Sequence, residues 1–142
     1  MGLDQYGMIR NKQIDFKKVY SDKYEPQKDG FVWRKHARLQ TFMAREFKKQ
    51  NPKEDTDAHS SMNGMGFNGD EHKVVITKDV LKRLENAIKE KYYNHFATDG
   101  FFWGHQFQEE QVKAYKKQDL EFIKFCKNAL EKKEVIEYSC SW

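Results

Sequence analysis

Residues 108–142 read QEEQVKAYKKQDLEFIKFCKNALEKKEVIEYSCSW, and this stretch decides the class of fold. Its first part, Gln108 to Lys132, carries apolar residues at helical spacing and predicts a helix. Its second part, Val135 to Trp142, alternates strictly between apolar and polar residues and predicts a strand. The helical stripe consists of Val112, Tyr115, Phe122, Ile123, Cys126, Ala129 and Leu130. The strand directs Ile136, Tyr138, Cys140 and Trp142 to one face, and Glu137, Ser139 and Ser141 to the other. A helix followed by a half-buried strand indicates an α+β domain.

Upstream of this stretch, two further strands and two further helices are expected. The strands cover Met1 to Arg10 and His72 to Ile76. One helix covers Phe31 to Lys49 and ends before Pro52, and the other follows an N-cap at Thr77 and runs to about Tyr93. The simplest architecture is a single α+β domain over 1–142: a small, mostly antiparallel sheet with about three helices packed on one face. Strand order stays open. A flexible acidic and Gly-rich loop is expected at about 53–71.

Composition bounds the class of protein. Only 38% of residues are hydrophobic, and 11 Phe, 7 Tyr and 3 Trp must supply much of the core. No apolar run is long enough for a membrane span, and the first residues lack the pattern of a signal peptide. Cys126 and Cys140 are far apart in sequence, which favours reduced thiols in a cytoplasm and leaves a disulfide between them open.

The net charge of the chain is small, but the charged residues are unevenly distributed along it. The net charge is +4, which is less lopsided than a dedicated nucleic-acid binder would show, so nucleic acid is not the expected partner. Residues 30–53 hold seven basic groups against one acid, a net +6, and residues 54–71 hold five acids and no Lys or Arg, a net −5. The two stretches could neutralise each other or serve separate partners.

Standard catalytic and cofactor motifs are absent from the sequence. It contains no phosphate loop, no dinucleotide fingerprint, no nucleophile elbow and no zinc-ligand spacing, so no cofactor and no metal are expected. His59 and His72 flank the acidic loop, and a weak divalent-ion site there is the one metal site that the sequence suggests. Glu137 is a candidate acid–base residue because it shares its strand face with two small serines, which could form a pocket floor. A solvated strand face is the alternative.

Two segments stand out as candidate binding sites. Trp33-Arg34-Lys35-His36-Ala37-Arg38 would begin a helix, with Arg34 and Arg38 one turn apart and suited to a phosphate or carboxylate. Asp99-Gly100-Phe101-Phe102-Trp103-Gly104 places three consecutive rings between glycines, where one ring could form a stacking platform. A solvated basic face and a buried core are the respective alternatives.

These segments also carry a resemblance to a family of small bacteriophage proteins. It rests on the Met-Gly-Leu-Asp start, Trp33-Arg34-Lys35-His36, Phe67-Asn68 before a strand and a Thr-led helix, Asp99-Gly100-Phe101-Phe102-Trp103-Gly104, and the Tyr138-Ser139-Cys140-Ser141-Trp142 end. Members mostly have no assigned activity, and some are labelled phosphoglycerate kinase. That label is physically implausible, because the two-domain hinge of that enzyme does not fit in 142 residues. Members often end in Ser-Trp-Trp, whereas this chain ends at Ser141-Trp142.

What the resemblance implies is a phage counter-defence protein that sequesters an anionic, nucleotide-like signal molecule in the host bacterial cytoplasm. An inhibitor that docks on a host enzyme or defence complex through the acidic loop and exposed rings is the alternative. A small nucleotide-processing enzyme, resting on Glu137 or a histidine, is the third reading, and homo-oligomerisation is left open. The candidate ligand-binding residues are Trp33, Arg34, Lys35, His36, Arg38, Asn68, Phe102, Trp103, Glu137, Ser139 and Ser141.

Overall fold

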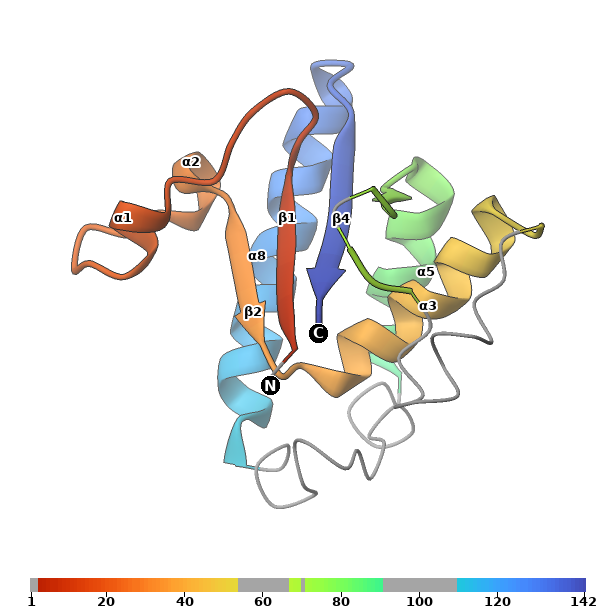
Figure 1. Cartoon of the computed structure of the whole chain (residues 1–142), viewed down its shortest axis with the longest axis horizontal. Helices are drawn as coiled ribbons and strands as arrows, with labels where there is room; N and C mark the ends of the chain where they lie inside the picture. Colours follow the sequence, from red (N-terminus) through yellow and green to blue (C-terminus); the bar gives the residue numbers. More distant parts are fainter. Residues whose placement is uncertain (1–2, 54–66, 70, 91–109) are drawn as a thin grey trace.

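A four-stranded antiparallel sheet forms the centre of the computed structural model (Figure 1), which describes residues 3–53, 67–69, 71–90 and 110–142. The strands are β1 (Asp4–Ile9), β2 (Phe31–Arg34), β3 (Val74–Val75) and β4 (Ile136–Ser141), and their order in the sheet is β2-β1-β4-β3. The first and last long strands of the chain therefore pair at the centre. This arrangement confirms the α+β class and supplies the strand order that sequence patterns left open.

Three substantial helices accompany the sheet: α3 (Ala37–Gln50), α5 (Lys78–Lys89) and α8 (Val112–Glu131). Two single-turn helices, α1 (Phe16–Val19) and α2 (Pro26–Asp29), lie in the connection between β1 and β2. The Thr77 cap is confirmed, because its hydroxyl accepts a hydrogen bond from the Val80 amide at 3.2 Å. Within the described residues, no helix combines the length and the apolar character that crossing a membrane requires.

The helix predicted over Phe31 to Lys49 is wrong at its start. Phe31–Arg34 is strand β2, and α3 begins only at Ala37. Phe31 and Trp33 alternate inward as strand residues, and the chain then turns at Lys35, whose φ of +59° is left-handed backbone. Arg34 and Arg38 are consequently not neighbours on one helical face.

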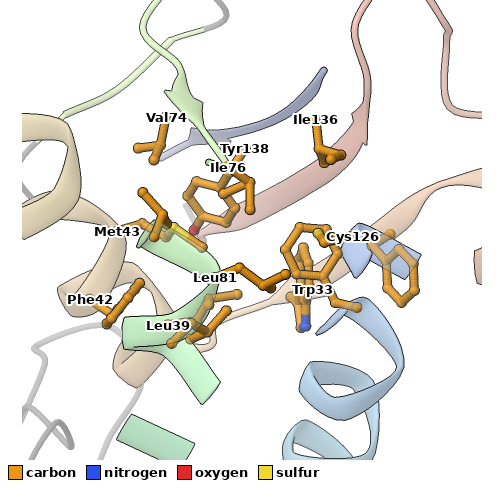
Figure 2. Packing of buried hydrophobic residues seen from close by; sticks show 14 of the residues in the cluster. Trp33, Leu39, Phe42, Met43, Val74, Ile76, Leu81, Cys126, Ile136 and Tyr138 are labelled. Carbon is orange, nitrogen blue, oxygen red and sulfur yellow. The ribbon is translucent and has the colours of Figure 1, made fainter. Parts of the chain in front are cut away.

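The core lies between the sheet and the helices and is built in large part from rings. Trp33 and Phe122 meet edge to face with centroids 5.0 Å apart, and Phe31 stacks on Trp33 at 5.7 Å. Gly7 permits this approach, since a Cβ there would lie only 2.7 Å from Phe122 Cε1. Figure 2 shows Trp33, Tyr138 and Cys126 among the aliphatic residues that α3, α5 and the strands contribute.

Side chains from the helices close both edges of the sheet. On the β2 edge, Tyr115 Oη donates to the Arg34 carbonyl at 2.7 Å and Gln118 Nε2 donates to the Val32 carbonyl at 3.3 Å. On the β3 edge, the Gln50 side-chain amide donates to the Val75 carbonyl at 2.7 Å and accepts from the Val75 amide at 2.9 Å. Unpaired edge groups template strand addition, so these caps disfavour edge-to-edge association.

The two faces of the sheet differ in chemistry. Ile136, Tyr138 and Cys140 are buried on the face that meets the helices, as the alternation in β4 predicted. The opposite face, called the open face below, carries partly exposed side chains from β1, β2 and β4: Asp4, Tyr6, Met8, Arg34, Glu137, Ser139 and Ser141. The connection that contains α1 and α2 lies beside β1 and β2 (Figure 1).

Candidate functional site

A hollow of about 600 Å³, called the basic hollow below, lies on the open face between β1, β4 and the residues that follow β1. Pockets of this size suit small-molecule ligands. Its floor comes from β1 and β4, and its wall comes from the connection that leads to α1. The residues around it are Tyr6, Met8, Ile9, Arg10, Asn11, Lys12, Gln13, Ile14, Phe16, Lys73, Glu137, Ser139 and Ser141.

The antiparallel register aligns the floor residues in rows across β1 and β4. Tyr6 is opposite Ser139, and Met8 is opposite Glu137. One row further along, Asp4 is opposite Ser141 on one side and opposite Arg34 of β2 on the other. Successive same-face residues on a strand are two positions apart, so the three rows are evenly spaced along the open face.

Positive charge predominates around the basic hollow. Three cations, Arg10, Lys12 and Lys73, and one acid, Glu137, give its surrounding residues a net charge of +2. Arg10 Nε lies 3.2 Å from Glu137 Oε2, and Lys73 Nζ lies 3.8 Å from Glu137 Oε1. Lys12 Nζ lies 3.7 Å from Glu134 Oε2, so the three cations meet two carboxylates. A net charge of +1 remains to attract an anionic ligand.

Aromatic rings stand at the wall of the basic hollow. Tyr6 and Phe16 meet edge to face, with centroids 5.8 Å apart and an interplanar angle of 86°. Phe16 is 46% exposed, which leaves ring surface available to a ligand. The hydroxyls of Ser139 and Ser141 add hydrogen-bonding groups beside these rings.

The Trp33-to-Arg38 segment is divided between the core and the surface. Arg34 is on the open face, where its Nε lies 3.1 Å from Asp4 Oδ1. Trp33, His36 and Arg38 are at most 1% exposed, so they cannot bind a ligand from solvent in this structure. The segment therefore supplies one surface cation, Arg34, together with the partly exposed Lys35, and does not form the continuous anion site that helical spacing predicted.

A buried polar network takes up the interior members of that segment. His36 Nε2 and Asp119 Oδ2 share a hydrogen bond at 2.8 Å, and Trp33 Nε1 donates to Asp119 Oδ1 at 3.1 Å. The His36 ring also stacks on Tyr115 at 4.0 Å. Burial raises the pKa of the Tyr115 hydroxyl, the Asp119 charge raises it further, and the Arg38 charge partly offsets the rise.

Asn68 has a structural position. Its side-chain amide donates to the Trp142 carbonyl and accepts from the Trp142 amide, both at 2.9 Å, and so holds the last residue of the chain beside the end of β4. Phe102, Trp103 and most of the acidic loop lie outside the described residues. Three predicted residues, Glu137, Ser139 and Ser141, meet in the basic hollow, and Arg34 lies on the same face.

Sequence reasoning missed several residues of the basic hollow: Tyr6, Arg10, Lys12, Phe16 and Lys73. A signal existed for Tyr6, because it alternates with the inward-facing Gln5 and Gly7 in the predicted first strand. Its pairing with Ser139 could not be predicted, since nothing local in sequence indicates that β1 and β4 are neighbours.

Among the residues that the structure describes, the cysteines are buried and the histidines are not grouped to hold a metal ion. Cys126 and Cys140 are free, buried thiols, and burial raises the pKa of Cys140 to about 12, partly offset by a hydrogen bond from Gln40. Among the described residues, no group of three or more His, Cys, Asp and Glu side chains is placed to hold a metal ion. His59, one of the two histidines of the divalent-ion site considered above, lies outside the described residues.

Comparison of the chain with protein-family models, with curated proteins and with solved structures finds no significant match. The fold and the site define an α+β protein with a basic, ring-bearing hollow on the face of its sheet opposite the three long helices α3, α5 and α8. Its function is therefore inferred from the chemistry of that hollow.

Proposed function

We propose that this protein is a phage counter-defence binding protein that sequesters an anionic, nucleotide-like signal molecule in the host cytoplasm, and that the basic hollow is its binding site. The phage origin and the counter-defence role rest on the sequence resemblance. The observation that carries the binding site is the convergence of cations, rings and hydroxyls in one hollow: Arg10, Lys12, Lys73, Tyr6, Phe16, Ser139 and Ser141.

Each component of the basic hollow matches one part of a nucleotide. Arg10, Lys12 and Lys73 suit a phosphate group, since guanidinium and ammonium groups form charge-assisted hydrogen bonds with its oxygens. The partly exposed rings of Tyr6 and Phe16 suit a planar base. The serine hydroxyls can donate to or accept from ribose and base edges.

The energies of such contacts are sufficient for tight binding. Base–ring stacking contributes about 1–3 kcal/mol and each charge-assisted hydrogen bond about 1.5–3 kcal/mol. One stack with three such bonds therefore approaches roughly 8 kcal/mol, the binding free energy of a complex with a micromolar Kd. One further bond lowers the Kd below a micromolar value.

Binding is favoured over catalysis by the groups that surround the hollow. Among its described residues are two serine hydroxyls and one carboxylate, but no histidine or cysteine that would activate or act as a nucleophile. The carboxylate, Glu137, is engaged by Arg10 and Lys73. A protein of this kind returns its ligand chemically intact.

Thermal unfolding with a panel of linear and cyclic nucleotides tests the proposal. A ligand that binds the folded chain raises Tm by mass action, and we expect this rise in the wild type, its loss in Arg10→Ala and its retention in Lys82→Ala. Lys82 is a matched control because it is an exposed cation on α5, away from the open face. An unchanged wild-type Tm across the whole panel would refute the proposal, and conversion of a nucleotide to product would replace it with an enzymatic function.

A further inference from the structure

Two arginine–carboxylate pairs lie at opposite ends of the open face. Arg34 Nε contacts Asp4 Oδ1 at 3.1 Å, and Arg10 Nε contacts Glu137 Oε2 at 3.2 Å. The first pair lies in the row of Asp4 and Ser141, and the second engages the row of Met8 and Glu137. Between these rows lies that of Tyr6 and Ser139.

The register sets the spacing of the two rows that carry the carboxylate partners of these arginines. Asp4 and Met8 are four residues apart on β1, and a strand rises about 3.3 Å per residue, so the two rows are about 13 Å apart. The Tyr6 row is two residues from each of them, or about 7 Å. A ring placed on Tyr6 would thus have an arginine on either side.

Both arginines retain donors for a ligand. Their hydrogen bonds within the described residues use Nε, whereas each guanidinium carries four further N–H groups on its two terminal nitrogens. Both side chains are about half exposed or more, at 48% for Arg10 and 65% for Arg34. The carboxylates orient the two guanidiniums and leave them accessible from solvent.

We propose that the ligand is a dinucleotide with two phosphate groups, one held by Arg10 together with Lys12 and Lys73, the other held by Arg34. A base lies against Tyr6 between them. This inference rests on the proposed function and specifies its ligand class: a mononucleotide would occupy one end of the open face, whereas a dinucleotide would engage both arginines at once.

Titration calorimetry with 3′,3′-cyclic di-AMP, which has two phosphates, and 3′,5′-cyclic AMP, which has one, tests this specificity. We expect Arg10→Ala and Arg34→Ala each to weaken binding of the dinucleotide roughly tenfold to a hundredfold, the equivalent of one charge-assisted hydrogen bond. Binding of the mononucleotide should fall in only one of the two variants. Lys82→Ala should leave both affinities unchanged.

Removing Arg34 alone leaves Asp4 without its partner, and a bare carboxylate would itself repel phosphate. The double variant Asp4→Asn/Arg34→Ala removes both charges, and the loss of dinucleotide affinity should persist in it if the guanidinium binds the ligand. Full affinity in the double variant, or equal dependence of both nucleotides on Arg10 alone, would overturn the two-phosphate inference and leave the proposed function standing. No binding of either nucleotide to the wild type would overturn the inference directly, and failure of the whole nucleotide panel would remove the function as well.

Discussion

His36 and Asp119 form a buried pair, with Nε2 and Oδ2 2.8 Å apart and neither side chain exposed to solvent. The same carboxylate accepts the indole N–H of Trp33, so the end of β2, the turn into α3 and the middle of α8 meet at one residue. The Trp33-to-Arg38 segment, which the sequence predicted as an anion-binding motif, therefore serves largely to connect β2, α3 and α8 in the interior.

Replacing Asp119 should destabilise the fold. In Asp119→Ala, the buried Trp33 indole and His36 ring lose their hydrogen-bond partner, and each buried polar group left unsatisfied costs about 1–3 kcal/mol. Urea denaturation measures this loss. Lys116→Ala, an exposed position on the same helix, serves as control and should change stability by less than about 0.5 kcal/mol. Equal stabilities of the two variants would show that Asp119 does not connect these elements.

Gln50 should protect the β3 edge of the sheet. Its amide pairs with both backbone groups of Val75, so Gln50→Ala should speed hydrogen exchange at the Val75 amide and lower stability by about 1 kcal/mol. Gln50→Glu keeps an oxygen that can accept from the Val75 amide but loses the donor to the Val75 carbonyl, so it should retain only part of the protection. Identical exchange rates at Val75 in the wild type and Gln50→Ala would contradict the capping role.

Alkaline pH should destabilise the protein through its buried thiols. Burial raises the pKa of the Cys140 thiol from 9.0 to about 12. Burial also raises the pKa of the Cys126 thiol and of the Tyr138 hydroxyl. Because the unfolded chain loses these protons first, the Cys140 contribution to stability is intact below about pH 9 and is lost as pH rises toward 12.

The free energy of unfolding, measured in urea at a series of pH values, tests this effect. It should fall less steeply above pH 9 in Cys140→Ala than in the wild type, because the variant lacks one of the groups whose pKa is raised. Parallel curves would show that Cys140 is not protected from ionisation in the folded chain.

Local patterns in the sequence predicted much of the fold and part of the site. The period-2 alternation of β4 separates Tyr138 and Cys140 from Glu137 and Ser139, and this separation needs no knowledge of the neighbouring strands. The helices α5 and α8 were likewise predicted from the cap and the apolar stripes that they contain.

The errors arise where long-range contacts override local spacing. Trp33 fits the helical stripe of α3 by coincidence of spacing, and Lys35 adopts left-handed backbone without the glycine that would signal it. The partnership of Tyr6 with Ser139 depends on pairing between segments 133 residues apart, which no local pattern specifies. The sequence therefore predicted the β4 side of the basic hollow, with Glu137, Ser139 and Ser141 on one strand face. It did not predict the residues that β1 and the following connection contribute.

Backbone amide NMR of the isotope-labelled protein, titrated with 3′,3′-cyclic di-AMP, tests directly whether the open face is the ligand-binding surface. The largest shift changes should occur at Tyr6, Lys73 and Ser139, with a further set at Arg34. The second hollow, about 330 Å³ between α5 and α8 and including Lys82 and Leu130, should remain unchanged. Shifts confined to that second hollow, or none at all at saturating ligand, would contradict binding on the open face.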